Sequence, residues 1–215
     1  MKEKITRKQT LGEEIANAVS HGIGALASIF GTIILIIFGI EQQDTAGIIL
    51  GAFYGLSLII LYTSSTLYHS LSNEKAKKVF RILDHCNIYF LITGTYAPIS
   101  VLMIGGTLGY LLLAANFLCG VLGIILNAIN MKKFKVISMF LYILMGWMCA
   151  FIAKPLIMAV PLKELFILLL GGIAYTVGII FYGLTKIKYM HFIWHIFVLL
   201  GSVLQYIFIF NGYYL

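Results

Sequence analysis

Charged residues are scarce in this sequence. Only 11% of its 215 residues are Asp, Glu, Lys or Arg, whereas 61% are hydrophobic, and the mean hydropathy is +1.00. A soluble domain of ordinary composition has about 25% charged residues, so this deficit excludes a soluble fold, which could not bury so much apolar surface. A membrane-spanning helix needs roughly 20 apolar residues, so the chain holds at most about eight spans and leaves no room for a second, soluble domain.

Cysteine is also rare. Cys86, Cys119 and Cys149 fall one in each of three predicted helices, and no CxxC pair occurs. This spacing excludes a disulfide framework and a thiolate metal site. A cleavable signal peptide is not indicated, because the first apolar stretch lacks a small-residue cleavage pattern and further spans follow it. We expect the mature chain to begin at Met1.

Long hydrophobic runs occupy most of the sequence. They predict membrane-spanning helices near residues 16–39, 46–69, 84–104, 107–128, 135–153, 163–184 and 190–210. We therefore predict an all-α integral membrane protein, built as one seven-transmembrane helix bundle over residues 1–215. Seven spans place the two termini on opposite sides of the membrane.

The positions of the lysines and arginines predict the orientation of the bundle. Of the fifteen, all but Lys154 and Lys163 precede the first span or lie between spans two and three, four and five, or six and seven. Positively charged loops stay in the cytoplasm, so we expect a multi-pass protein of the plasma (cell) membrane with a cytoplasmic N-terminus and an external C-terminus. The net charge of +7 then comes from loops and does not indicate a nucleic-acid-binding surface.

Three local signals refine the spans. Thr10-Leu11-Gly12-Glu13 matches the capping-box pattern and predicts a short cytoplasmic helix that leads into the first span. Pro98 predicts a kink in the third span, because proline removes one backbone hydrogen bond. Pro155 and Pro161 are predicted to bracket the loop between spans five and six.

All five histidines fall near the predicted cytoplasmic ends of the spans, namely His21, His69, His85, His191 and His195. His191 and His195 are four residues apart and share one helix face, so their rings can bind one metal ion. HxxxH alone is a weak pattern and lacks the glutamate of the HExxH motif. His69 can supply a third nitrogen, and three histidines with an open fourth position are typical of catalytic zinc. We interpret His21 and His85 as supporting or interfacial residues.

Asp84 is the one acidic residue predicted at a span end beside the histidines, and the other seven are assigned to loops or termini. A carboxylate in this position can orient a zinc-bound water and accept its proton. The alternative is that Asp84 caps the third span as an N-terminal residue. Asn17 and Ser65 are candidates to fix the orientation of the histidine rings by hydrogen bonding.

In their order along the chain, these motifs resemble the hemolysin III family of the progestin and adipoQ receptor superfamily, which is related to adiponectin receptors and alkaline ceramidases. The resemblance covers nearly the whole chain. It rests on Glu14-x-x-Asn17, Ser65-x-x-x-His69, Asp84, Gly94-Thr95-Tyr96-Ala97-Pro98 and His191-x-x-x-His195. It implies a seven-helix bundle with a cytoplasmic N-terminus and a zinc ion held by His69, His191 and His195. It also implies that Asp84 holds the water bound to this metal, with Ser65 beside it.

The leading functional hypothesis is a zinc-dependent, ceramidase-like hydrolase of a lipid amide or ester, with a membrane lipid as its substrate and Asp84 and Ser65 as catalytic residues. A zinc-stabilised membrane receptor or sensor is one alternative, although the short external loops argue against a receptor for a protein hormone. A cytolytic factor is another, although no ring of charges predicts a wide pore. Haem is a third possibility, but an i, i+4 pair cannot supply both axial ligands from one helix.

Overall fold

The computed structural model describes residues 7–215, and within this range the regular structure is entirely helical. The main helices are α1 (Leu11–Glu41), α2 (Thr45–Ser70), α3 (Glu74–Pro98), α4 (Gly106–Asn130), α5 (Lys135–Gly146), α6 (Ala153–Ala159), α7 (Leu162–Gly183) and α8 (Met190–Ile209). The π-helical segments Ile99–Ile104 and Phe210–Tyr214 continue α3 and α8, and the 3-10 segment Met148–Ile152 joins α5 to α6. Seven helical segments of residues 7–215 are long and apolar enough to cross a membrane. The predicted all-α, seven-helix fold is confirmed.

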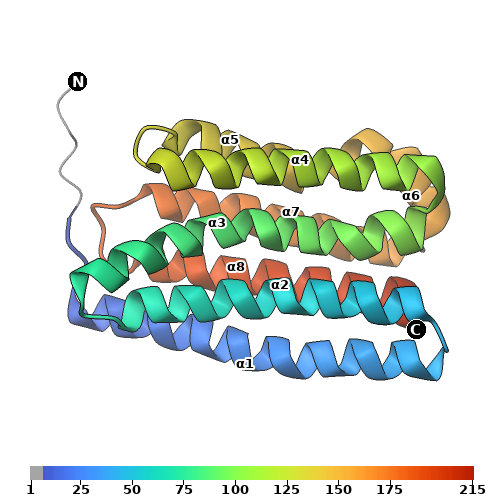
Figure 1. The fold of residues 1–215 in the computed structure, drawn as a ribbon, viewed down its shortest axis with the longest axis horizontal. Helices are drawn as coiled ribbons and strands as arrows, with labels where there is room; N and C mark the ends of the chain where they lie inside the picture. Colours follow the sequence, from blue (N-terminus) through green and yellow to red (C-terminus); the bar gives the residue numbers. More distant parts are fainter. Residues whose placement is uncertain (1–6) are drawn as a thin grey trace.

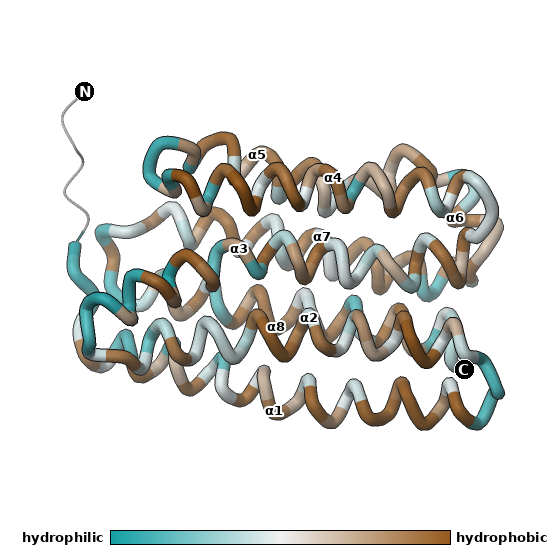
Figure 2. The backbone as a smooth tube through the Cα atoms, viewed as in Figure 1, coloured by the Kyte–Doolittle hydropathy of each residue, from teal (hydrophilic) through white to brown (hydrophobic). Residues whose placement is uncertain are grey.

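The long helices run side by side along the length of the molecule (Figure 1). The start of α1 and the α2–α3, α4–α5 and α7–α8 connections lie at one end, while the C-terminus and the α1–α2 connection lie at the other. Hydrophilic residues gather at the N-terminal end and hydrophobic residues follow the helices between the ends (Figure 2). The basic loops of the sequence therefore share one end of the bundle. Which end faces the cytoplasm stays a prediction.

The outer faces of the helices are apolar. Large side chains such as Phe30, Leu118, Phe140 and Ile180 are more than half exposed. A water-soluble protein rarely exposes so much contiguous apolar surface, whereas a bilayer solvates it. Together with the seven spans, these surfaces describe a multi-pass membrane protein.

The start of α1 follows the predicted capping box. Thr10 is the N-cap, its side chain accepts from Glu13 N at 3.4 Å, and the Glu13 carboxylate accepts from Thr10 N at 2.9 Å. Glu13 is buried, pairs with Arg7, and accepts from Tyr189 N at 2.8 Å. Because Tyr189 precedes α8, one carboxylate joins the beginnings of α1 and α8.

Two local predictions are corrected by the helix boundaries. The α3 helix begins at Glu74, and its N-cap is Asn73, whose Oδ1 accepts from Lys75 N and Ala76 N. Asp84 therefore lies inside the helix, and its interpretation as a helix cap is wrong. Pro155 does not border a loop but lies in the first turn of α6, where proline is tolerated because the first N–H groups have no helical partner.

Pro98 ends the α-helical part of the third span. Proline cannot donate to the carbonyl of the preceding turn, and the chain continues as the π-helical segment Ile99–Ile104. That segment closes with Gly105 N donating to Ser100 O at 3.0 Å. Gly105 has a φ of 64°, which glycine adopts without strain, and α4 begins at the next residue.

Candidate metal centre

Three histidines from two helices meet at the N-terminal end of the bundle. His69 lies in the last turn of α2, and His191 and His195 lie in the first two turns of α8. One ring nitrogen of each lies within 4.8 Å of the other two. The ring centroids are 5.2 Å apart for His69 and His191, 5.1 Å for His69 and His195, and 4.8 Å for His191 and His195. This cluster can hold a metal ion.

The nitrogens of this cluster lack partners. Within residues 7–215, Nε2 of His69, His191 and His195 is buried and has no hydrogen-bond partner. Three buried, unsatisfied nitrogens facing one point are costly unless something binds them. Zinc–nitrogen bonds of about 2.0–2.1 Å in tetrahedral geometry bring the nitrogens within roughly 3.5 Å of one another, so small rotations of the rings would close the cluster on a zinc ion. The residues present fit the metal that the family resemblance implies.

The opposite nitrogen of His69 is held by a carboxylate. His69 Nδ1 lies 2.7 Å from Glu14 Oε2, and the other carboxylate oxygen accepts from Lys77 Nζ at 2.7 Å. A carboxylate only accepts, so Nδ1 carries the ring proton and Nε2 keeps its lone pair, the form that binds a metal. Glu14 on α1 therefore fixes both the tautomer and the orientation of a ring on α2.

His195 is prepared in the same way by Ser20. The Ser20 hydroxyl donates to Asn17 O at 2.9 Å and lies 3.4 Å from His195 Nδ1. Since its proton is already used, Ser20 accepts from Nδ1, which leaves the Nε2 lone pair free. Asn17 Nδ2 lies 3.4 Å from His69 Nδ1, but both are donors in this tautomer, and Asn17 Nδ2 donates to Gln9 Oε1 at 2.9 Å instead. Asn17 therefore contacts His69 without orienting it by a hydrogen bond.

His21 lies behind the cluster. It is 1% exposed, and its ring stacks on His195 with centroids 3.6 Å apart and 10° between the planes. Both of its nitrogens lack partners within the described residues. His85 lies on α3, outside the three-histidine cluster, and its ring is 6.1 Å from that of Tyr182. Both histidines were expected outside the metal-binding set.

Asp84 and Ser65 are buried near the cluster. Asp84 is 2% exposed, Ser65 is fully buried, and Asp84 lies within electrostatic range of His69. Asp84 Oδ2 and Ser65 Oγ have no hydrogen-bond partner among residues 7–215. A buried carboxylate oxygen without a partner is available to a ligand or to water. Their catalytic roles, and those of the histidines as ligands, stay predictions.

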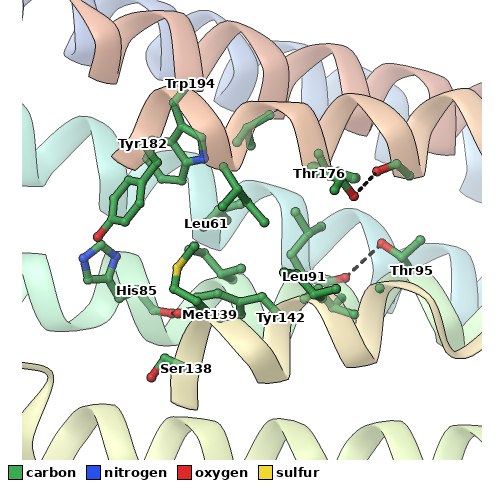
Figure 3. A pocket seen from close by; sticks show the side chains of 18 of the residues that line it. Leu61, His85, Leu91, Thr95, Ser138, Met139, Tyr142, Thr176, Tyr182 and Trp194 are labelled. Carbon is green, nitrogen blue, oxygen red and sulfur yellow. Dashed lines mark hydrogen bonds between the residues drawn. The ribbon is translucent and has the colours of Figure 1, made fainter. Parts of the chain in front are cut away.

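A cavity of about 220 Å³ extends from this region into the bundle. His21, Asp84 and His85 line its polar end, and its walls come from α2, α3, α5, α7 and α8. Figure 3 shows His85, Tyr182 and Trp194 toward one end, with Thr95 and Thr176 toward the other. Its lining along the third span runs from Arg81 of α3 to Ile99 at the start of the π-helical segment, roughly 27 Å at the rise of an α-helix.

The body of this cavity is apolar, even where threonines line it. Thr95 Oγ1 donates to Leu91 O at 2.9 Å and Thr176 Oγ1 donates to Gly172 O at 2.8 Å (Figure 3). Trp147 Nε1 donates to Thr176 Oγ1 at 3.0 Å, which uses the indole donor as well. The polar groups of these side chains are thus occupied. Gln205 lines the cavity and its Oε1 has no hydrogen-bond partner within residues 7–215, and the mainly apolar wall around it suits a hydrocarbon chain.

Sequence reasoning missed the roles of Glu13 and Glu14. It placed Glu13 in a capping box and Glu14 in the Glu14-x-x-Asn17 motif, but it did not predict that Glu13 is buried and contacts Tyr189 or that Glu14 contacts His69. The available signal was spacing: Glu14, Asn17 and His21 recur at three and four residues, which places them on one helix face.

The fold and these features define a multi-pass α-helical membrane protein with a buried three-histidine cluster at one end. A family model described as Haemolysin-III related matches residues 9–206, so the chain belongs to this family and the predicted resemblance is confirmed. The chain is 43% identical to "Hemolysin-3 homolog" of Bacillus subtilis (strain 168), over 90% of this chain and 91% of that protein. It is 42% identical to "Hemolysin-3" of Bacillus cereus, over 96% and 94%. The human "Monocyte to macrophage differentiation factor" is 29% identical over 93% of this chain and 84% of its own length.

Proposed function

We propose that this protein is a zinc-dependent hydrolase of a lipid amide or ester, with His69, His191 and His195 as the zinc ligands. One observation carries the proposal: Asp84, whose Oδ2 has no hydrogen-bond partner, and His21, which stacks on His195, line one end of a long apolar cavity, and the three unpartnered Nε2 atoms of the cluster lie next to that end. A purely structural metal site needs the histidines but not the cavity. A lipid-binding cavity alone does not need the unpaired nitrogens.

Each residue has a distinct task in this proposal. When bound, zinc supplies a Lewis acid that polarises a carbonyl group and makes water more acidic. Asp84 Oδ2 accepts the proton of the attacking water, and Ser65 hydrogen-bonds beside it. Glu14 and Ser20 hold the rings of His69 and His195 with Nε2 deprotonated. The apolar cavity holds the acyl chain, and its walls limit the access of bulk water.

We place the site on the cytoplasmic side of the plasma membrane. The basic connections lie at the same end of the bundle as the histidines, and basic loops favour the cytoplasm. The substrate would reach the site from the inner leaflet.

Metal analysis tests the ligand set. Purified protein is expected to carry about one zinc per chain, and His69→Ala, His191→Ala and His195→Ala are each expected to lower zinc content and thermal stability together, because metal binding is coupled to the folded state. His85→Ala is the matched control and should retain zinc. Full zinc occupancy in all three ligand variants would reject the site.

Two alternative functions give different results. A zinc-stabilised receptor or sensor is supported by the way the cluster joins α2 to α8 and, through Glu14 and Ser20, to α1. In that case chelation lowers the melting temperature, but no ceramide or phospholipid is hydrolysed. A cytolytic role is supported only by the names of the bacterial relatives. It requires the release of dye from lipid vesicles with or without metal.

A further inference from the structure

The polar end of the cavity is bordered by three cations from two parts of the chain. Arg81 of α3, Lys132 of the α4–α5 connection and Lys135 of α5 line it together with Asp84 and His85. We call Arg81, Lys132 and Lys135 the basic mouth. Lys135 Nζ lies 5.3 Å from the centroid of the Tyr182 ring, whose centroid is 6.0 Å from that of His191. The basic mouth therefore adjoins the histidine cluster.

Membrane orientation alone does not account for this placement. Lysines that serve only to keep a loop in the cytoplasm need no particular direction. Lys78 of α3 and Lys133 of the α4–α5 connection are exposed, as the residues of the basic mouth are, but they do not line the cavity. Three cations of the same end do line it. They therefore bring positive charge to the wall of the cavity, where it acts on whatever the cavity binds.

No carboxylate of residues 7–215 forms an ion pair with Arg81 or Lys135, although Asp84 lies within electrostatic range of Arg81. Within residues 7–215, the ion pairs of lysine and arginine are Arg7 with Glu13 and Lys77 with Glu14. An arginine fork and a lysine ammonium group at one opening match a phosphate or carboxylate headgroup.

We propose that the basic mouth binds the anionic headgroup of a single-chain amphiphile whose hydrocarbon chain occupies the cavity. This inference rests on the proposed function and narrows its substrate class to lipids with a phosphate or carboxylate headgroup. The headgroup lies at Arg81, Lys132 and Lys135. The scissile group comes next, beside Asp84 and His21, and the chain extends along α3 toward Ile99.

Binding of two detergent-like probes with the same chain tests the charge requirement. Dodecyl phosphate is anionic, and dodecylphosphocholine has the same chain and phosphate but no net charge. Calorimetric titration into the full chain in lipid nanodiscs is expected to give tighter binding of dodecyl phosphate. Equal affinity of the wild-type protein for the two probes would overturn the proposal, and this comparison needs no variant to fold.

Matched double variants locate the charge. Arg81→Gln with Lys135→Gln is expected to weaken dodecyl phosphate binding about thirtyfold and to leave dodecylphosphocholine binding nearly unchanged, since each of the two cations contributes about 1 kcal/mol near an anionic surface. Lys78→Gln with Lys133→Gln removes the same charge outside the cavity and should bind like the wild type. Equal losses in both double variants would indicate a diffuse field and overturn the proposal.

Two further measurements test whether the cavity binds the hydrocarbon chain of the probe and whether the basic mouth binds a free anion equally well. Gly172 lines the cavity, and Gly172→Leu is expected to weaken both dodecyl probes by filling the space for the chain. Inorganic phosphate should bind far more weakly than dodecyl phosphate, and comparable affinity would indicate a free-anion site instead.

The binding and hydrolysis measurements test the two proposals separately. Specific binding without lipid hydrolysis would refute the hydrolase alone. Hydrolysis with no preference for anionic probes would refute the basic mouth alone.

Discussion

Asp84 differs from the other carboxylates of residues 7–215 because it combines deep burial with an oxygen that has no hydrogen-bond partner and lies 3.9 Å from His85 Nδ1. Glu13 is equally buried, but its oxygens are bonded to Arg7, Thr10 and Tyr189. Burial of an unsatisfied carboxylate costs stability, and such a cost is retained where the group has a chemical task. The capping alternative no longer competes, because Asn73 caps α3.

Asp84→Asn tests this task directly. The variant keeps the shape of the side chain but cannot accept a proton, so lipid amide hydrolysis is expected to fall about a hundredfold or more, the scale of a positioned general base. Zinc content and melting temperature should stay near the wild-type values. The exposed carboxylate variant Glu74→Gln on the same helix is the control. Wild-type activity in Asp84→Asn would remove this residue from the mechanism.

Glu14 is expected to act through His69 rather than on the substrate. Glu14→Gln replaces a charged acceptor by a neutral amide, and loss of such an outer partner typically weakens metal binding by 10–100-fold. Competition with a zinc chelator of known affinity measures the effect. Lys77→Gln removes the other partner of Glu14 but leaves its contact with His69, so it should weaken zinc binding much less. Equal effects of the two variants would show that the network, not the histidine contact, is what matters.

At the scale of the helices, α3 shows what could be predicted from the sequence. Hydropathy located the span correctly, but it reports where the membrane begins and not where the helix begins. The residues from Glu74 to Arg81 are too charged to enter the bilayer, yet they form the first two turns of α3. This extension places Lys77 opposite Glu14 and leaves Asp84 inside the helix. The grouping of His69 with His191 and His195 was predicted because their helix ends share one membrane level.

Close helix packing was not predictable, because it depends on which small residue meets which large one. Gly123 of α4 faces the ring of Tyr89 on α3, and a Cβ at this position would overlap that ring. Tyr89 is fully buried, so it has no space into which to move. Such small-residue contacts let membrane helices approach closely.

Gly123→Val is therefore expected to destabilise the α3–α4 pair by about 1–3 kcal/mol, the usual cost of overpacking. A lower melting temperature in detergent, with zinc content preserved in the folded fraction, is the expected result. Gly183→Ala at the end of α7 is the control, since a Cβ there meets no atom within 4 Å. An unchanged melting temperature for Gly123→Val would contradict the packing seen between α3 and α4.

For the whole molecule, the arrangement of the loops joins topology to chemistry. The basic connections, the histidine cluster and the basic mouth all occur at the end of the bundle where α1 begins (Figure 1). The opposite end is joined by short connections and contains the C-terminal residue contacts, such as Gln42 Nε2 donating to Tyr214 O at 2.9 Å. If the basic end is cytoplasmic, the proposed substrate must come from the inner leaflet.

Reporter fusions test this orientation. A reporter after Leu215 is expected to be external and one inserted beside Lys132 to be cytoplasmic, because all but Lys154 and Lys163 of the fifteen lysines and arginines lie in segments on the expected inner side. Three of the predicted spans separate Lys132 from Leu215, so the two reporters should lie on opposite sides of the membrane. Each reporter therefore checks the result of the other. An external signal from the reporter at Lys132 together with a cytoplasmic signal from the reporter at Leu215 would show that the predicted orientation is reversed. The histidine cluster would then lie on the side of the outer leaflet. The histidine cluster and cavity would be unaffected by that result, but the inner-leaflet substrate would have to be abandoned.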